Sequence, residues 1–288
     1  MTSGWMDFLA TAVRRPAAAA LLGGAAMLAT LATLATLAAP MAAIAQTPET
    51  LKLELAGQRV ALDVYRPSPA APAGASIGAN AAAVPRGAVI LSHGFTRSRS
   101  TLGGHAAALA AAGAVAITPD LPYTFDFRRN AQGLAELVAW VRRGGASGGA
   151  PLERVVLVGF SAGGLSSLLA ATTPGVVGYV GLDAFDREVD EGAGALGLGF
   201  APRMGTEAIL LRAPPSRCNA QSASAPWGRA LPALVSERVL EGASHCDFEA
   251  PSDWICRLAC GPTDAARQAE VRRTLLDAVE RWLPQPGR

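Results

Sequence analysis

The stretch that decides the fold is 154-RVVLVGFSAGGLSSLLAA-171, in which a glycine-rich turn separates two apolar runs. The apolar residues before the turn predict a buried strand, and the run after it predicts a helix. The turn has the pattern GxSxG with Ser161 at its centre, which in a strand-turn-helix context is typical of a nucleophile elbow. Gly159 and Gly163 supply the small residues that such a strained, tightly packed turn requires. The stretch therefore predicts that Ser161 is a nucleophile presented at the end of a strand.

Apolar runs and helical stretches alternate on both sides of this turn. Buried strands are predicted at residues 88–91, 114–118, 155–158, 177–182 and 209–211, and helices at residues 102–112, 131–143, 162–171 and 264–282. Two short runs at residues 51–55 and 59–65 flank Ala56 and Gly57 and predict an antiparallel hairpin ahead of them. The sequence therefore predicts an α/β fold, with a mostly parallel twisted sheet, helices on both faces and functional groups at the carboxyl ends of the strands.

The first 45 residues differ in composition from the rest of the chain. A pair of arginines precedes an Ala/Leu-rich run at residues 17–39, and a small-x-small segment suited to signal peptidase follows. We expect a signal peptide over residues 1–45, cleaved between Ala45 and Gln46. The mature protein is then expected to be periplasmic or secreted and to have no membrane contact, and an uncleaved membrane anchor is the alternative.

The remaining residues, 46–288, suit one large domain by their length. Apolar residues make up 50% of the sequence and charged residues 17%, which is typical of a globular protein and excludes a disordered chain. Basic and acidic residues nearly balance after residue 45 and the basic ones are scattered, so we expect no nucleic-acid partner. Residues 68–86 are rich in Ala, Pro, Gly and Ser without periodicity, and they predict a flexible loop.

Three histidines are candidates for the base that activates the serine. A serine hydroxyl becomes a strong nucleophile only when a base takes its proton, and after an elbow of this kind the base follows later in the chain. His245 is the histidine that follows Ser161, and it lies in a loop just past a short apolar run. We therefore expect His245 to be the general base, His93 to be a structural hydrogen-bonding residue and His105 to be a satisfied or exposed helix residue.

Two backbone N–H groups are needed to stabilise the negative charge that develops on a carbonyl oxygen during attack. Ala162 directly follows the nucleophile, and we expect its N–H to be one donor of this oxyanion hole. The segment Ser92-His93-Gly94-Phe95 follows a predicted strand. We expect the N–H of Phe95 to be the second donor, with Gly94 permitting the tight turn.

The acid that orients the base is predicted at an uncommon position in the chain. Such an acid usually follows the predicted strand at residues 209–211, but residues 212–224 contain no Asp or Glu. The preceding predicted strand ends in the segment GLDAFD, which contains Asp183 and Asp186. Asp183 is the first candidate because a residue at the end of a parallel strand projects from the edge of the sheet where the elbow also lies. Asp186 is the alternative acid.

Four cysteines lie in the last third of the chain, at positions 218, 246, 256 and 260. An even number of cysteines in an exported protein predicts two disulfides. We expect Cys218 to pair with Cys246, at the same end of the sheet, and Cys256 to pair with Cys260. Half of a metal site is the alternative for the CxxxC spacing, but no further cluster with zinc-ligand spacing accompanies it, and we expect no metal.

Several of these motifs together resemble a known family. GFSAGG at residues 159–164 and GLDAFD at residues 181–186 resemble motifs of the α/β-hydrolases, and within them of the chlorophyllase-like branch. HGFTRSRST at residues 93–101, ITPDLP at residues 117–122 and GASH at residues 242–245 are similar to segments of bacterial cutinase-type polyester hydrolases. Those polyester hydrolases place the acid after the later strand, and this sequence does not. The resemblance implies an α/β-hydrolase fold and a serine hydrolase.

Acyl transfer is the chemistry that these residues predict. His245 deprotonates Ser161, the serine attacks a carboxylic ester, and water then releases the acyl-enzyme. We expect no metal or organic cofactor, and a small-molecule or polymeric ester as the substrate. A lipase or polyester depolymerase, a peptidase, and an inactive binding module of the same fold are the alternatives.

Overall fold

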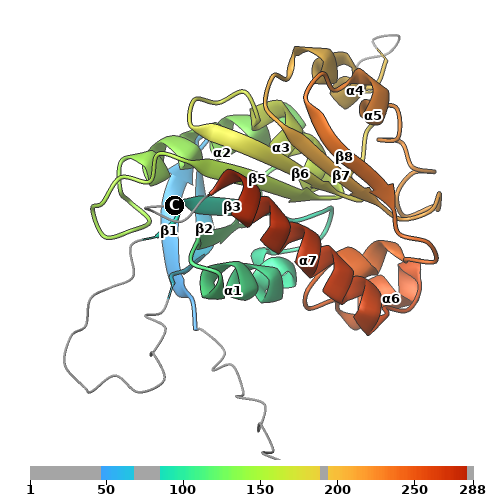
Figure 1. The fold of residues 1–288 in the computed structure, drawn as a ribbon, viewed down its shortest axis with the longest axis horizontal. Coiled ribbons are helices and arrows are strands. Elements are labelled where there is room, and N and C mark those ends of the chain that lie inside the picture. The colour runs from blue at the N-terminus through green and yellow to red at the C-terminus, as the bar shows by residue number, and fades with distance from the viewer. Residues whose placement is uncertain (1–46, 68–84, 189–193, 284–288) are drawn as a thin grey trace, which may run out of the picture. The chain divides into compact units, whose positions relative to one another are not determined.

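The computed structural model describes residues 47–67, 85–188 and 194–283, which contain an eight-stranded sheet (Figure 1). The strands are β1 (Glu49–Leu55), β2 (Gln58–Tyr65), β3 (Ala88–Ser92), β4 (Val115–Pro119), β5 (Val155–Phe160), β6 (Val176–Leu182), β7 (Ala208–Arg212) and β8 (Leu234–Val239). Their order in the sheet is β1-β2-β4-β3-β5-β6-β7-β8. β1 and β2 form an antiparallel hairpin, β2 pairs antiparallel with β4, and the pairs from β4 to β8 are parallel. The predicted mostly parallel sheet with an N-terminal hairpin is confirmed.

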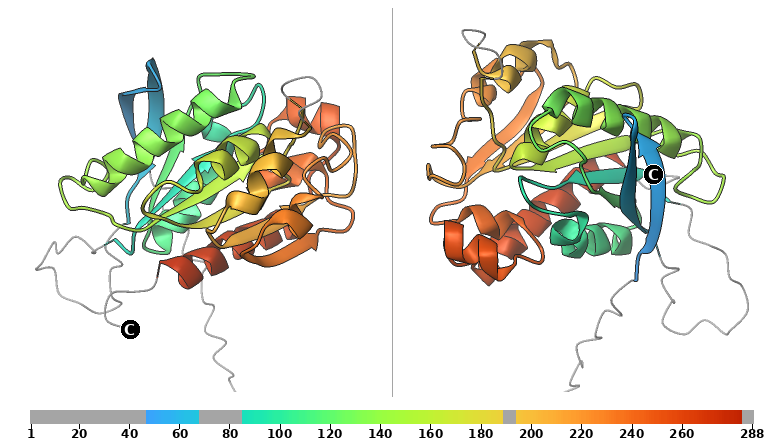
Figure 2. Two further views of the ribbon diagram at one scale, coloured as in Figure 1. Left: turned by 90° about the horizontal axis from the view of Figure 1, so that it is seen from above. Right: turned by 180° about the vertical axis from the view of Figure 1, so that it is seen from behind.

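Helices cover both faces of the sheet (Figure 2). The α-helices are α1 (Gly103–Ala111), α2 (Phe127–Arg142), α3 (Ala162–Ala170), α4 (Leu196–Phe200), α5 (Trp227–Ala230), α6 (Trp254–Cys260) and α7 (Ala265–Trp282), and the 3-10 helices are η1 (Arg99–Leu102), η2 (Ala201–Arg203) and η3 (His245–Phe248). α1 and α7 pack on one face of the sheet, and α2 and α3 pack on the other.

Strand β5 shows how the two faces are filled. Val155 and Leu157 belong to the core cluster that contains α2 and α3, whereas Val156 and Val158 belong to the cluster that contains α1 and α7. Successive side chains of a strand point to opposite faces, so a strand covered on both sides must be apolar at every position. This explains the continuous apolar run before the elbow.

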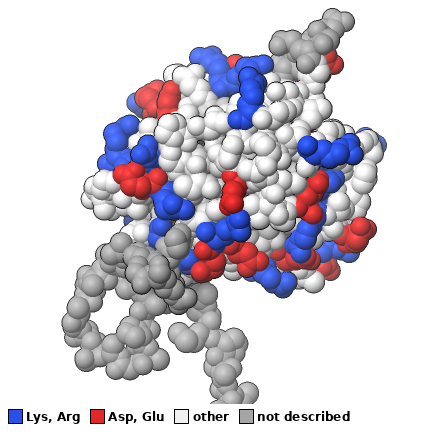
Figure 3. Space-filling view, turned by 45° about the horizontal axis from the view of Figure 1, so that its top comes forward, with Lys and Arg blue, Asp and Glu red and all other residues white. Residues whose placement is uncertain are grey.

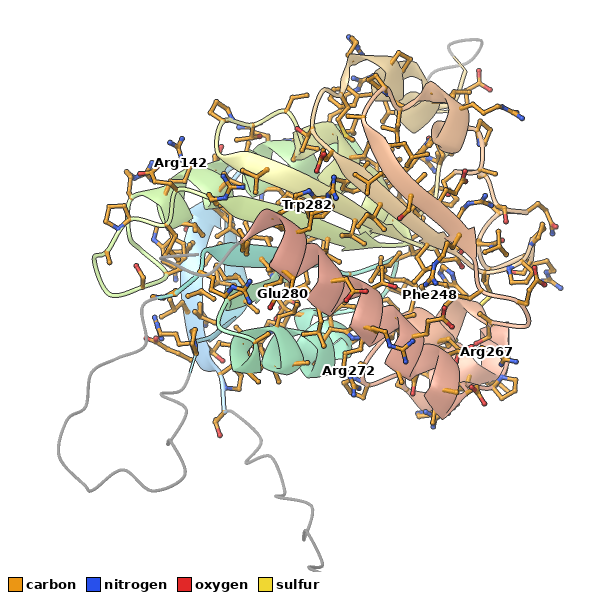
Figure 4. The ribbon with its side chains drawn as sticks, viewed as in Figure 1. Arg142, Phe248, Arg267, Arg272, Glu280 and Trp282 are labelled. Atoms are coloured by element: carbon orange, nitrogen blue, oxygen red, sulfur yellow. A yellow bond between two sulfur atoms is a disulfide. The ribbon has the colours of Figure 1, made fainter. Side chains whose placement is uncertain are left out.

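The C-terminal helix α7 lies across one face of the sheet (Figure 4). Its Trp282 packs on β6, where a Cβ added to Gly178 would lie 2.2 Å from the indole. Its Glu280 accepts hydrogen bonds of 2.6 and 2.9 Å from the guanidinium of Arg86, the last residue of the predicted loop. The chain therefore re-enters the sheet at β3 from a point that is anchored to α7.

Strand β8 is the part of the sheet that the sequence does not predict. It lies at the edge of the sheet, and Val235 and Val239 are 37% and 38% exposed. An edge strand with an exposed face carries polar residues among the apolar ones, so β8 lacks the apolar run that reveals the central strands.

Two of the sequence predictions fall on segments that the structure does not describe. Residues 1–45, predicted as a signal peptide, and residues 68–84 of the predicted loop lie outside the described residues. Among the residues that are described, no helix is long and apolar enough to cross a membrane. Figure 3 shows basic and acidic side chains interspersed over one face of the molecule, in agreement with the scattered charges of the sequence.

Candidate active site

Ser161 occupies a strained turn between β5 and α3. Its backbone has φ 52° and ψ −122°, values that residues other than glycine rarely adopt. Its N–H donates to Leu182 O at 3.1 Å, and its carbonyl accepts from the N–H of Phe185 at 3.0 Å, so the end of β6 fixes the turn. The backbone therefore has the geometry of a nucleophile elbow.

The glycines around Ser161 are required by close backbone contacts. A Cβ on Gly159 would lie 2.4 Å from Gly163 O, and a Cβ on Gly163 would lie 2.3 Å from Ser92 O. A Cβ on Gly164 would lie 2.6 Å from the Cβ of Ala184. Glycine is therefore needed at all three positions, because the helix after the serine packs directly against the strand ends.

His245 and Asp183 form a buried pair beside the elbow. The Nδ1 of His245 lies 2.6 Å from the Oδ2 of Asp183, and the two residues are 7% and 1% exposed. The imidazole ring also lies 4.6 Å from the ring of Phe160, between centroids. A proton on Nδ1 that is donated to the carboxylate leaves the Nε2 lone pair free to accept one. Among the described residues, no hydrogen bond joins His245 to the Ser161 hydroxyl, a contact that commonly tightens when substrate binds.

Asp183 is held by the loop that follows β7. Its Oδ1 accepts hydrogen bonds from the N–H of Ala213 at 3.0 Å and from the Nδ2 of Asn219 at 3.1 Å. Asn219 is fully buried. The carboxylate is thus fixed by His245 on one oxygen and by this loop on the other. No sequence motif singles out Asn219, although it lies in the segment where the acid is usually found.

Asn219 also organises an unusual turn. Ala220, Gln221 and Ser222 have φ values of 51°, 60° and 59°, so three successive residues are left-handed. Such residues cost about 1–2 kcal/mol each when they are not glycine. The Oδ1 of Asn219 accepts from the N–H groups of Ser216 at 2.8 Å and Ser222 at 3.0 Å, which closes the turn around the amide. The strain lies beside the acid, where structures often store it.

Asp186 has a different environment from Asp183. Its Oδ1 accepts from the N–H of Gly197 at 2.8 Å. Its Oδ2 accepts from the N–H of Leu198 at 2.8 Å and from the indole Nε1 of Trp227 at 2.6 Å. These donors join the start of α4 to α5. Of the two candidate acids, the structure brings Asp183 to His245 and uses Asp186 to hold two short helices together.

The expected oxyanion loop, residues 93–97, follows β3 and lies against Ser161. A Cβ on Gly94 would lie only 2.9 Å from the Cβ of Ser161, so the loop approaches the serine as closely as a glycine allows. Phe95 follows Gly94 in this loop, and Ala162 begins α3 on the other side. The first N–H groups of a helix have no partner within the helix, which leaves the N–H of Ala162 available for an oxyanion.

His93 fixes the oxyanion loop through two hydrogen bonds. Its Nδ1 lies 2.8 Å from Gly94 O, to which it donates, and its Nε2 accepts from the N–H of Leu121 at 2.9 Å. Burial lowers the pKa of His93, which favours the neutral ring that can both donate and accept. The expected structural role of His93 agrees with this geometry.

Two further contacts join the oxyanion loop and α1 to the loop that carries the base. Arg97 donates to both carboxylate oxygens of Glu249, at 2.7 and 2.9 Å, and Glu249 is fully buried. The Nε2 of His105 lies 3.2 Å from Phe248 O. His105 is fully buried, and desolvation lowers its pKa to about 4, so it is not an exposed helix residue. Because both partners lie just after His245, these contacts help to position its imidazole.

Two disulfides hold the loop that contacts Asp183 and the loop that carries His245, and their pairing differs from the one expected. Cys246 pairs with Cys256, and Cys218 pairs with Cys260, with Cα–Cα distances of 5.9 and 5.8 Å. All four cysteines are therefore in disulfides, and the expected Cys218–Cys246 and Cys256–Cys260 pairing is wrong.

Helix α6 is the reason for the different pairing. Cys256 and Cys260 lie four residues apart on this helix. Cβ atoms at that spacing are about 5–6 Å apart, and a disulfide needs about 3.5–4.5 Å. Each cysteine therefore reaches another element. Cys256 bonds to the neighbour of His245, and Cys260 bonds to the neighbour of Asn219.

Two cavities open beside the elbow. The α6 cavity, of about 190 Å³, is lined by Ser161 and His245, by Phe160 and by Ile255 and Ala259 of α6. The Tyr123 cavity, of about 110 Å³, is lined by residues that include Gly94, Tyr123, Thr124, Asn130 and Ala162. Phe95, Thr96 and Arg97 line both cavities and separate them.

Comparison with known proteins identifies the fold. No protein-family model and no curated protein matches the sequence. Among solved structures, dienelactone hydrolase from Anabaena variabilis is 16% identical, with a TM-score of 0.59 over 82% of this chain and 99% of that one. A serine hydrolase without a lid from Xanthomonas campestris is 16% identical, with a TM-score of 0.55 over 83% and 96%. A serine hydrolase homologue from Coxiella burnetii is 14% identical, with a TM-score of 0.57 over 81% and 98%. The chain therefore has the α/β-hydrolase fold.

Proposed function

We propose that the protein is a serine hydrolase of carboxylic esters, with Ser161 as nucleophile, His245 as general base and Asp183 as the acid that orients the base. The observation that carries this proposal is the buried hydrogen bond between Asp183 and His245, because His245 lines the same cavity as the strained Ser161. The structural neighbours named as serine hydrolases support the proposal through their fold.

The geometry supports a two-step acyl transfer. The Nε2 of His245 takes the proton of the Ser161 hydroxyl as the Oγ–carbon bond forms at the ester carbonyl. The N–H groups of Phe95 and Ala162 stabilise the oxyanion, and Asp183 stabilises the imidazolium through Nδ1. Collapse of the intermediate breaks the bond to the alcohol, which leaves with the proton from Nε2. Water then repeats the sequence on the acyl-enzyme and releases the acid.

A fluorophosphonate probe tests this proposal against an inactive binding module of the same fold. We expect stoichiometric labelling of the parent and of Ser100→Ala, an exposed serine of η1 that serves as control, and no labelling of Ser161→Ala. Equal labelling of Ser161→Ala and the parent would remove Ser161 from the mechanism. A screen of p-nitrophenyl esters of increasing chain length beside insoluble polyesters and peptide anilides separates the proposed esterase from a lipase, a polyester depolymerase and a peptidase.

We also propose that the protein is exported. The two disulfides support this, because disulfides persist mainly in oxidising compartments. The signal peptide proposed for residues 1–45 supplies the route. Intact-mass measurement of the exported protein is expected to give a chain that begins at Gln46. A mature N-terminus upstream of residue 40 would contradict the proposed cleavage.

A further inference from the structure

The two cavities adjoin different sides of the proposed reaction centre. Ser161 and His245 line the α6 cavity, whereas Ala162, one of the proposed oxyanion donors, lines the Tyr123 cavity. The ring of Phe95 stands between them and contacts the rings of Phe125, Phe127 and Phe185 at 5.3–5.8 Å. An ester bound at Ser161 therefore has two separate places for its two substituents.

The proton transfer decides which substituent enters which cavity. When the tetrahedral intermediate collapses, the bond between the carbonyl carbon and the alcohol oxygen breaks, and that oxygen receives the proton held by the Nε2 of His245. The alcohol oxygen must then lie against the imidazole, which lines the α6 cavity. The carbonyl oxygen lies between the N–H groups of Phe95 and Ala162. The remaining substituent, the acyl chain, is directed to the Tyr123 cavity.

The α6 cavity is apolar and has a rigid wall. Phe160, Ile255 and Ala259 line it together with the half-cystines 218, 256 and 260. The charge of Arg97 is paired with Glu249 and Asp253 and does not require a charged ligand. Helix α6 is fixed by both disulfides, so the wall cannot move away from a bound group.

Apolar surface also continues outside this cavity. Trp254 and Leu258, on the same helix, are 66% and 79% exposed. Residues four apart on a helix are neighbours on its surface, so these side chains extend the apolar area of α6 beyond the cavity. A long alcohol chain that outgrows the cavity therefore meets further apolar surface.

The Tyr123 cavity is smaller, and the side chains of Asn130, Tyr123 and His93 on its wall bond to the protein itself. Both ends of the Asn130 amide bond to the backbone of Tyr123, and the Tyr123 hydroxyl donates to Ala56 O at 2.7 Å. Both nitrogens of His93 are also occupied. These hydrogen bonds hold the polar side chains to the protein, and the limited volume favours a short acyl chain.

We infer that the preferred substrates are esters of a short acyl group with a bulky apolar alcohol. This inference rests on the proposed function and adds the orientation of the substrate. The alcohol occupies the α6 cavity, with Ile255 and Ala259 as specificity-determining residues, and the acyl group occupies the Tyr123 cavity.

A pair of isomeric esters tests the inference without changing size or polarity. Hexyl acetate and ethyl hexanoate have the same atoms, but the long chain is on the alcohol in the first and on the acyl group in the second. We expect kcat/KM for hexyl acetate to exceed that for ethyl hexanoate by about tenfold or more, the range that a few methylenes in an apolar pocket provide. A ratio of one or below would overturn the orientation.

Three variants test whether the two cavities determine the ratio of kcat/KM for hexyl acetate to kcat/KM for ethyl hexanoate. Ala259→Trp fills the α6 cavity and is expected to lower the ratio about tenfold, whereas Thr124→Trp in the Tyr123 cavity is expected to raise it. Val235→Trp adds the same side chain at an exposed position of β8 that lines neither cavity, and it is expected to leave the ratio near that of the parent. A ratio unchanged by both cavity variants would overturn the inference. Fluorophosphonate labelling of the same preparations distinguishes the two proposals. A protein that is labelled at Ser161 but does not prefer hexyl acetate contradicts only the orientation of the substrate. A protein that is not labelled and cleaves neither ester contradicts both proposals.

Discussion

The two flanks of Ser161 are held in place in different ways. On one flank, the oxyanion loop at residues 93–97 is fixed without covalent links, by the hydrogen bonds of His93 and by the Arg97–Glu249 ion pair. On the other flank, the loop after β7 that holds Asp183 and the loop after β8 that carries His245 are joined through α6 by two disulfides. Both flanks place groups against the same serine, but only the second uses covalent bonds to do so.

The strands that carry the loops explain this difference. β3 lies inside the sheet and is buried at every position, whereas β8 is an edge strand with exposed residues. A loop that leaves a buried central strand is positioned by the packing of that strand. The edge strand before the loop of His245 offers less packing of this kind, and a disulfide restricts the conformational entropy of the unfolded chain. The Cys246–Cys256 bridge therefore ties down a loop that leaves the edge strand.

Among the variants that compare the two flanks, Gly94→Ala on the non-covalent flank is expected to have the largest effect. The added Cβ would lie 2.9 Å from the Cβ of Ser161, so the oxyanion loop must move away and carry the Phe95 N–H with it. Loss of one oxyanion donor lowers kcat by about 10²- to 10³-fold, which we expect for hydrolysis of p-nitrophenyl acetate. Gly199→Ala is the matched control, because nothing lies within 4 Å of the added Cβ. Equal activity of the two variants would show that the loop does not supply a donor.

The next effect is expected on the covalent flank, from removal of either disulfide. Cys218→Ser/Cys260→Ser frees the loop of Asn219, and Cys246→Ser/Cys256→Ser frees the loop of His245. A misplacement of about 1 Å lowers kcat by about 10²-fold, and we expect a loss of about 10- to 100-fold in each double variant. Loss of kcat in neither variant would show that packing alone positions the acid and base.

The same variants differ in stability. The cysteines of the Cys218–Cys260 bridge are 42 positions apart in the sequence, and those of the Cys246–Cys256 bridge are 10 positions apart. In the chain-entropy description, the longer loop gives the larger stabilisation, by about 1 kcal/mol. Urea unfolding is therefore expected to show a lower free energy of unfolding for Cys218→Ser/Cys260→Ser than for Cys246→Ser/Cys256→Ser.

A smaller effect on rate is expected from Asn219→Ala, which leaves the disulfide intact. The variant removes the side-chain donor to Asp183 Oδ1 but keeps the N–H of Ala213. A buried hydrogen bond to a charged group contributes about 1.5–3 kcal/mol, and partial loss of the acid's orientation is expected to lower kcat about tenfold with KM nearly unchanged. A rise in KM with an unchanged kcat would indicate a role in shaping the cavity instead of a role in positioning the acid.

A further prediction concerns stability alone, and it depends on the contact between His105 of α1 and Phe248 in the loop of His245. Desolvation lowers the pKa of His105 from its ordinary value of 6.5 to about 4, so below pH 6.5 the unfolded chain binds a proton that the folded chain does not. The free energy of unfolding therefore falls as pH is lowered from about 6.5 to about 4, by on the order of 3 kcal/mol from this residue. We expect His105→Gln to reduce this fall in urea unfolding series at pH 7 and pH 4.5. An identical fall in the variant would assign the pH dependence to other groups.

The sequence predicts the two flanks to different extents. The elbow and the oxyanion loop are contiguous motifs, so GFSAGG and HGF are enough to predict them. The order of residues in the chain singles out His245, and the lack of a carboxylate in residues 212–224 directs attention to Asp183. Both predictions agree with the observed hydrogen bond.

The parts that the sequence does not predict depend on tertiary structure. Helix α6 is short and has exposed apolar residues, Trp254 and Leu258 among them, so no periodic pattern predicts it. Without that helix, the correct pairing of its two cysteines cannot be derived. Asn219 is recognised only when the loop after β7 is folded onto Asp183.

The comparison of Asp183→Asn with Asp186→Asn tests the central claim most directly. An asparagine at the position of the acid stabilises the wrong tautomer of His245, and we expect kcat of Asp183→Asn to fall by about 10³- to 10⁴-fold. Asp186 accepts hydrogen bonds from α4 and α5 and does not contact the base, so we expect Asp186→Asn to stay within about tenfold of the parent. If Asp183→Asn kept the kcat of the parent and Asp186→Asn lost it, the proposed site would be contradicted.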